Sequence, residues 1–146
     1  MPRTPSATFD TTQGPAKVNH GESAATIPLD VDELLARCMG SAALAQRLVM
    51  SFLSRTTEEM DELDRLLKAN RIDEFTRKSH QLRGSAANIS AHQLKRLFSV
   101  VERLGNEDRA AEIRPYMIEL RREADRLSSY CGELGWETAV QSPINQ

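Results

Sequence analysis

The chain has 146 residues, of which 27% are charged and 40% are apolar. This size suits one globular domain that buries its core without disulfide or metal cross-links, and it excludes a second domain of comparable size. With 19 Lys and Arg against 21 Asp and Glu, the formal charge is −2, so the chain as a whole has no basic excess for nucleic acid or anionic lipid.

The cysteines and the N-terminus indicate the environment of the protein. Cys38 and Cys131 are too few and too far apart for a disulfide scaffold or a zinc site, so we expect free, buried thiols. The N-terminus lacks the apolar segment of a signal peptide, and no run of about 18 apolar residues occurs. We therefore expect a cytoplasmic protein that does not associate with membranes.

The composition divides the chain into three parts. Residues 1–27 are rich in Pro, Gly, Ser, Thr and Ala, which is typical of a flexible tail. Residues 136–146 are mostly small or polar and are expected to fray. The domain is predicted over residues 28–135, where abundant Leu, Ala, Arg and Glu and little alternation favour helices over strands.

Two helices are predicted in the first half of the domain. The first spans residues 31–39, with Asp30 and Glu33 spaced as a capping box and Gly40 at its end. The second runs from 42 to about 69, with Ser41 as its N-cap and Asn70 in a left-handed C-terminal position. Its apolar face is expected to contain Leu48, Phe52, Thr56, Met60, Leu63 and Leu67.

Three further helices follow. The third, over 72–89, has an inward stripe of Ile72, Phe75, Ser79, Leu82, Ala86 and Ile89. The fourth starts after Ser90, which forms a capping-box spacing with Gln93, and ends at Gly105 before a short loop over 106–108; its stripe is Leu94, Leu97, Val101 and Leu104. The last has Ile113, Met117, Leu120, Ala124, Leu127, Cys131 and Leu134, and Pro115 predicts that it begins near Arg114 or bends there.

Four long amphipathic helices with short connections predict an all-α fold, an up-down antiparallel four-helix bundle with a short additional N-terminal helix over one end. The chain lacks the Glu-x-x-His pairs of di-iron bundles and the glycine-rich loops of nucleotide sites. We therefore expect no metal site and no nucleotide site.

His80 is the histidine most suited to chemistry. His20 falls in the tail, and His92 falls in the first turn of the fourth helix, where a solvated side chain is the simplest interpretation. On the third helix, His80 points roughly 130° away from the apolar stripe and so faces solvent. Its neighbours on that surface are Thr76, Arg77, Arg83 and Gly84, with Asp73 and Ala87 a turn further away.

The surroundings of His80 favour phosphorylation. Six cations and two acids between Arg71 and Arg96 give this segment a local charge of +4. Gly84 costs a helix about 0.8–1.0 kcal/mol relative to Ala, which suggests that a bulky side chain is unfavourable beside the imidazole. A neutral imidazole is a nucleophile near pH 7, and the guanidinium of Arg83 could stabilise an arriving phosphoryl group.

The segment His80-Gln81-Leu82-Arg83-Gly84-Ser85-Ala86-Ala87-Asn88-Ile89 resembles the signature of histidine-containing phosphotransfer domains, H-x-x-K-G-S/A-small-x-x-hydrophobic. Val101-Glu102-Arg103-Leu104 resembles the later helix of that family, and the similarity covers about residues 29–134. The resemblance implies that His80 accepts a phosphoryl group from the aspartyl phosphate of a receiver domain and passes it to another receiver. Arg83 then stands at the usual lysine, and Gly84 leaves room for the partner.

The resemblance also implies partners. Receiver domains of response regulators and a hybrid sensor kinase would dock on Thr76, Arg77 and Ala87, with Leu35 and Met39 as an apolar rim. Mg²⁺ would be held by the receiver, so this chain would need no cofactor. We expect a monomeric carrier that is not itself an enzyme and that binds neither nucleic acid nor membrane.

Two alternatives remain open at this stage. One is a non-catalytic helical adaptor that binds a receiver or a kinase domain without being phosphorylated. The other is the dimerising part of a histidine kinase. That family usually has an acidic residue directly after its histidine, whereas Gln81 follows His80 here, so the sequence disfavours it.

Overall fold

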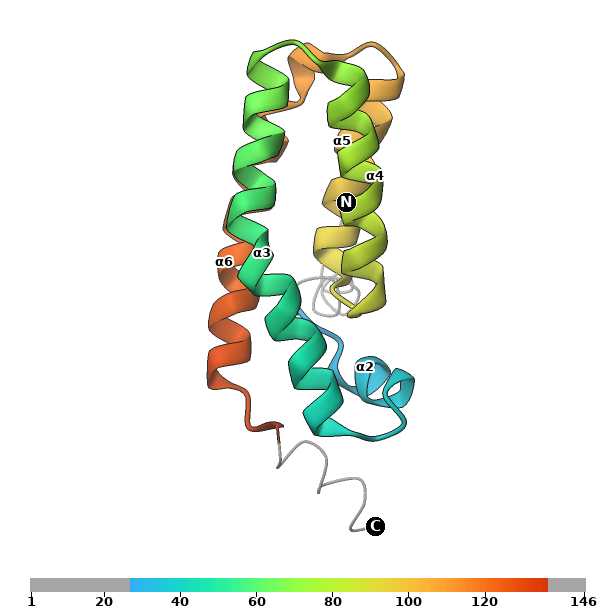
Figure 1. Ribbon diagram of the computed structural model, residues 1–146, viewed down its shortest axis with the longest axis vertical. Coiled ribbons are helices and arrows are strands. Elements are labelled where there is room, and N and C mark those ends of the chain that lie inside the picture. Colours follow the sequence, from blue (N-terminus) through green and yellow to red (C-terminus); the bar gives the residue numbers. More distant parts are fainter. Residues whose placement is uncertain (1–26, 137–146) are drawn as a thin grey trace, which may run out of the picture.

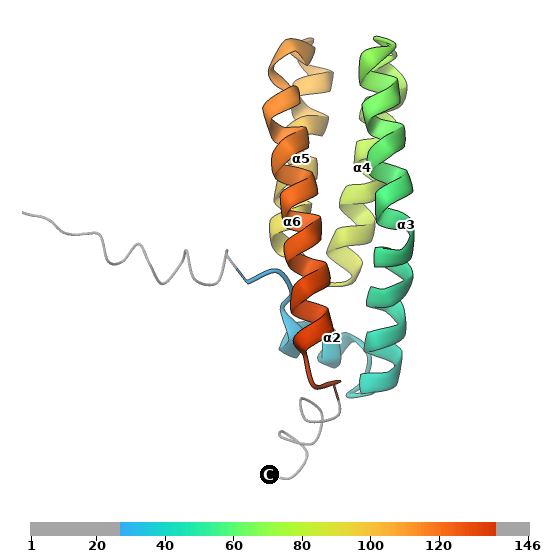
Figure 2. The ribbon, with the colours of Figure 1, turned by 90° about the vertical axis from the view of Figure 1, so that its left-hand side faces the viewer.

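The computed structural model describes residues 27–136, and the regular structure in this range is helical. The elements are α2 (Val31–Arg37), α3 (Ala42–Lys68), α4 (Ile72–Asn88), α5 (His92–Asn106), the short 3-10 helix η3 (Ala110–Glu112) and α6 (Arg114–Glu133). Helices α3 to α6 run alternately up and down the long axis of the molecule (Figure 1) and pack side by side (Figure 2). This confirms the predicted four-helix bundle, whereas the expected tails lie almost entirely outside the described residues.

Helix α2 covers the end of the bundle at which α4 ends and α5 begins (Figure 1). With 27 residues, α3 is about 40 Å long and extends beyond the shorter α4 and α5, so its first turns need a cover. Helix α2 supplies it by burying Leu34 and Leu35. The segment is tied to the α4–α5 turn by a 3.0 Å hydrogen bond from the Asp30 amide to the Ser90 carbonyl.

The core contains most of the side chains that periodicity predicts. In α4, α5 and α6 the predicted stripes are buried, with Ile72 and Leu134 only partly so. Helix α3 differs near its start, because Leu48 is 41% exposed while the smaller Ala45 and Val49 are buried, and near its end Leu66 is more buried than Leu67. Position around the helix, and not the size of the side chain, decides which residues face the core, so the prediction is wrong for Leu48 and holds only in part for Leu67.

One backbone motif ends four of the helices. The residue after each C-cap has a positive φ, and the next N–H donates to a carbonyl five residues earlier, which is the Schellman arrangement; the left-handed residues are Met39, Asn70, Ser90 and Asp108. The prediction for Asn70 is confirmed. The prediction that Ser90 is an N-cap is wrong, because Ser90 is fully buried in the turn and Ala91 occupies the N-cap of α5.

The other predicted caps hold in part. Asp30 and Ser41 each accept a hydrogen bond from the third backbone amide of the helix that follows, at 3.1 Å. Glu33 does not close the reciprocal half of a capping box, because its carboxylate lies against His92 of α5 and beside the Ser90 hydroxyl. The Ser90 contact is the main cause that lowers the pKa of Glu33.

The structure shows where α6 begins and how long the connection between α5 and α6 is. Pro115 lies in the first turn of α6, where its missing N–H costs no helical hydrogen bond, so the helix starts there instead of bending. The connection before it spans residues 107–113 and includes η3, so it is longer than the predicted loop.

Trp136 and the two cysteines belong to the core. Trp136, which the prediction assigns to the C-terminal tail, is buried, and Cys38 and Cys131 are free and buried as predicted. None of the described helices is both long and apolar enough to cross a membrane.

Candidate functional site

The imidazole of His80 faces solvent from the middle of α4. Its side chain is 61% exposed, whereas Ser79 and Leu82 on the same helix are buried. The position agrees with the prediction from the apolar stripe. A rigid helix in a packed bundle holds the ring at the surface, so a partner can reach it without any rearrangement of the core.

Glu102 of α5 is the closest acidic neighbour of this ring. Its Oε2 lies 2.8 Å from His80 Nδ1, and the Glu102 side chain is only 18% exposed. Sequence reasoning assigned no role to Glu102, because the two residues are 22 positions apart and on different helices. One signal was available: Glu102 follows the buried Val101, so it lies at the edge of the apolar stripe of α5.

Arg83, one turn after His80, contacts both groups. One terminal guanidinium nitrogen lies 2.8 Å from His80 Nδ1, and Arg83 Nε lies 3.0 Å from Glu102 Oε1. A neutral imidazole nitrogen is either a donor or an acceptor. Nδ1 can therefore donate a proton to Glu102 or accept one from Arg83, but it cannot do both at once.

This competition determines the state of the other ring nitrogen. When Nδ1 carries the proton and donates it to Glu102, Nε2 has a free lone pair. When Nδ1 accepts from Arg83, Nε2 carries the proton and is not a nucleophile. Among residues 27–136, His80 Nε2 makes no contact with a polar partner, so it is the nitrogen available to a reactant from outside.

The surface beside the imidazole is open at Gly84. A Cβ built on Gly84 would meet no atom within 4 Å, so the absence of a side chain leaves space that the fold itself does not fill. This residue is exposed, as is Arg77, and Ala87 is half-buried on the same helix. All three lie on α4 with His80, and their role in docking stays a prediction.

Three predicted docking residues lie differently. Thr76 is half-buried, with its hydroxyl against Gly105 of α5, so it faces the neighbouring helix. Leu35 is 6% exposed and belongs to the core, so its prediction as a surface residue is wrong; a short helix that covers a bundle end must bury its large apolar side chains. Met39 is 92% exposed, as a rim residue requires.

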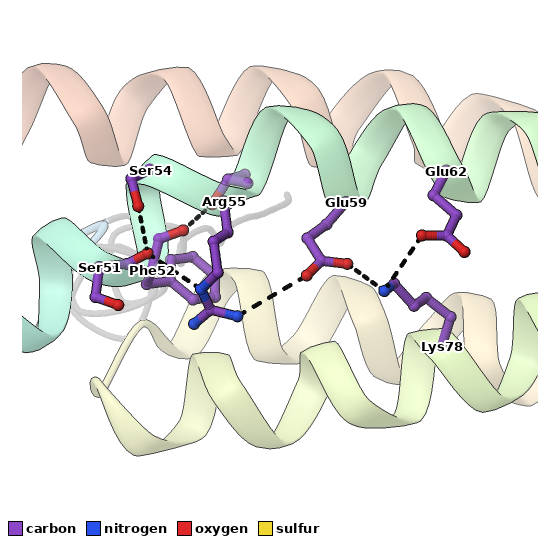
Figure 3. Close-up of polar contacts among 8 residues, drawn as sticks. Ser51, Phe52, Ser54, Arg55, Glu59, Glu62 and Lys78 are labelled. Carbon is purple, nitrogen blue, oxygen red and sulfur yellow. Dashed lines mark hydrogen bonds and ion pairs between the residues drawn. The ribbon is translucent and has the colours of Figure 1, made fainter.

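The cationic character of the site is weaker than the count along the chain predicts. Lys78 turns toward α3 and forms ion pairs with Glu59 and Glu62, which lie one turn apart (Figure 3). These contacts raise the pKa of Lys78, with the Glu59 hydrogen bond as the main cause. Arg71 pairs with Glu74 at 2.6 Å. Because Glu74 is already included in the count, it is the compensation of Lys78 by α3 that makes the cationic excess near His80 smaller than the predicted +4.

Comparison with known proteins identifies the family. Residues 47–130 match the Hpt domain, and these residues include α4, α5 and the whole His80 site. No curated protein and no solved structure matches the chain. Hpt domains are phosphotransfer carriers of two-component phosphorelays, they are not kinases, and they interact with receiver domains. Because the match covers more than half of its residues, the chain belongs to the Hpt domain family.

Proposed function

We propose that His80 Nε2 accepts a phosphoryl group from the aspartyl phosphate of one receiver domain and transfers it to the aspartate of another. The observation that carries this proposal is the geometry of the ring. The His80 side chain is 61% exposed, and Nδ1 lies 2.8 Å from the carboxylate of Glu102, which leaves Nε2 as the ring nitrogen without a polar partner among the described residues. A hydrogen bond from one ring nitrogen to a carboxylate fixes the tautomer and orientation of an imidazole, so that the other nitrogen can act as the nucleophile.

The transfer step balances without any further reactant. The Nε2 lone pair forms a bond to phosphorus, the bond from phosphorus to the aspartyl oxygen breaks, and the aspartate leaves as a carboxylate. The imidazole keeps its proton on Nδ1 and becomes positively charged. Glu102 stabilises this charge through the hydrogen bond it already makes. The reverse sequence of bond changes delivers the phosphoryl group to the second receiver.

Arg83 and Gly84 have supporting roles in this proposal. The guanidinium of Arg83 adjoins the ring and offers several N–H donors to the phosphoryl oxygens once it leaves Nδ1. Gly84 allows the receiver to approach the ring closely. Mg²⁺ is assigned to the receiver, and this chain supplies positioning and charge stabilisation to a reaction that depends mainly on them.

The docking surface in this proposal surrounds the imidazole. Arg77 and Ala87 lie on the same helix, and Met39 offers an exposed apolar side chain near the start of α3. The partners are receiver domains of response regulators, including one attached to a hybrid sensor kinase, and the carrier acts as a monomer.

A transfer assay with matched histidine variants tests the assignment. A receiver labelled with radioactive phosphate is mixed with wild type, His80→Gln or His92→Gln, and the label on each chain is measured after acid and after base. We expect acid-labile, base-stable label on wild type and on His92→Gln, and none on His80→Gln. Equal labelling of His80→Gln would refute the role of His80.

The adaptor hypothesis predicts a different outcome of the same experiment. An adaptor would bind the receiver with unchanged affinity after His80→Ala and would take no label from any receiver. Binding measured by calorimetry alongside the label therefore separates the two functions.

A further inference from the structure

A second cluster of chemically capable side chains lies where α2 meets α5, at the turn that also contains Ser90. His92 is the first residue of α5, Asp30 is the N-cap of α2, and Glu33 lies in the first turn of α2. We propose that these three residues bind a zinc-like divalent cation through His92 Nε2 and one oxygen from each carboxylate. This site is separate from the relay chemistry at His80 and does not depend on it.

The distances agree with this chemistry. His92 Nε2 lies 2.7 Å from Glu33 Oε1 and 3.9 Å from Asp30 Oδ2, and the three ligand atoms lie within 4.8 Å of one another. In a tetrahedral zinc site with bonds of about 2.0–2.2 Å, neighbouring ligand atoms are about 3.3–3.5 Å apart. The first separation is about 0.7 Å too short, the second about 0.5 Å too long and the third lies within 4.8 Å, so shifts of about one ångström, which exposed side chains make easily, complete the site.

The cluster contains more than the ion pair between His92 and Glu33. Glu33 Oε1 is a buried atom that lies 2.7 Å from His92 Nε2, so the carboxylate and the imidazole are already in contact. The neighbouring Ser90 is fully buried, and its hydroxyl lies beside the Glu33 carboxylate without reaching hydrogen-bonding geometry. A buried hydroxyl without a hydrogen-bond partner beside this carboxylate indicates that a further group completes the site.

Asp30 can serve as a ligand without losing its structural role. Its Oδ1 accepts the hydrogen bond that caps α2, while Oδ2 faces His92. The side chains of Asp30, Glu33 and His92 are each between a third and a half exposed. Three protein ligands at the surface leave a coordination position for water, the arrangement expected of an open site.

The donor set determines which cations fit. One imidazole nitrogen with two carboxylate oxygens suits zinc and its transition-metal neighbours, whereas Mg²⁺ prefers oxygen ligands in octahedral geometry. The bound cation would link α2 to α5 and thereby fasten the cover of the bundle end. A ligand that binds only the folded chain raises its thermal stability.

Calorimetric titration of the full chain with zinc chloride tests the site. We expect one zinc ion per chain with a dissociation constant on the order of 10 μM. The Tm should rise by about 5 °C when the free zinc concentration is about ten times this dissociation constant. Magnesium chloride should give neither effect. Asp30→Asn, which keeps a good helix cap but removes the ligating carboxylate oxygen, and His92→Ala should each weaken binding about tenfold or more.

Matched controls show whether the zinc is held elsewhere. His80→Ala and His20→Ala should bind zinc as wild type does, and circular dichroism of each variant shows that its helices are intact. Glu33→Gln provides a second ligand variant of unchanged size in case His92→Ala does not fold. Zinc binding that is equal in wild type, His92→Ala and Glu33→Gln would overturn the proposal, as would the absence of binding below about 1 mM zinc.

Discussion

Gly105 of α5 is predicted to set the distance between α4 and α5 at the reactive histidine. It lies one turn after Glu102 and faces Thr76, which lies one turn before His80. A Cβ at position 105 would overlap Thr76 Oγ1 and lie 3.3 Å from Thr76 Cβ. Rotation of the Thr76 hydroxyl relieves part of the overlap in Gly105→Ala, but the 3.3 Å contact with Thr76 Cβ is independent of that rotation and is relieved by moving the helices apart.

The expected loss of stability follows from two opposing effects. Replacing a helical glycine by alanine gains up to about 1 kcal/mol, and less near the last turn, where Gly105 lies. Overpacking of a close contact costs about 1–3 kcal/mol. We therefore expect Gly105→Ala to lower the free energy of unfolding by about 1–2 kcal/mol in a urea titration. Separation of the helices also lengthens the His80–Glu102 contact, and the loss of this charged hydrogen bond should slow phosphotransfer about tenfold.

Two comparison variants make this prediction refutable. In the double variant Thr76→Ala with Gly105→Ala the overlapping hydroxyl is gone, so most of the stability and of the transfer rate should return. Gly132→Ala in α6 meets no atom within 4 Å, so it should leave the transfer rate unchanged and should not destabilise the fold. A Gly105→Ala variant as stable as wild type, or a double variant no better than the single one, would show that Gly105 does not set the spacing.

Three further variants distinguish effects on phosphotransfer from effects on the free energy of unfolding. Gly84→Gln should change the free energy of unfolding by less than about 1 kcal/mol yet slow transfer from a phosphorylated receiver sharply, and equal rates would contradict close approach at this face. Leu82→Ala should lose about 2–5 kcal/mol of stability in urea, because Leu82 is buried, and a smaller loss would contradict that burial. Burial raises the pKa of Glu123 above its ordinary value, so the folded state binds this proton more tightly than the unfolded chain and stability falls as the pH rises above 4.5. Glu123→Met should therefore be more stable than wild type by about 1 kcal/mol at neutral pH, and an advantage of the same size in acid would contradict this cause.

The sequence predicts the exposed side of the site because that side belongs to one helix. The positions of His80, Arg83 and Gly84 relative to the core follow from the apolar stripe of α4 and a constant rotation per residue. Glu102 could not be predicted in the same way. Its contact with His80 depends on how far α5 is shifted along α4, and this shift is fixed by packing at places such as Thr76 and Gly105.

The net charge of a sequence segment likewise does not predict the charge of a surface, because it ignores the partners on neighbouring helices. Lys78 and His80 are two residues apart and therefore point in different directions from the helix. The Lys78 ammonium lies against Glu59 and Glu62 of α3 (Figure 3), so its charge is compensated on another face. A local excess of cations in the sequence describes a surface only after each cation has been assigned to a face and to the partners across it.

The replacement of the usual lysine by Arg83 has a consequence that follows from the shape of its side chain. A guanidinium is planar and carries several N–H groups, so Arg83 can hold Glu102 through Nε while a terminal nitrogen reaches His80 Nδ1. In this arrangement Arg83 stabilises the tautomer in which Nε2 is protonated, and Glu102 stabilises the tautomer in which Nε2 is a nucleophile. A phosphoryl group that attracts the guanidinium would remove the contact of Arg83 with His80 Nδ1 and leave the contact of Glu102 with the same nitrogen. In the proposed transfer, the arriving group would thus shift the ring toward its reactive form at the moment when that form is needed.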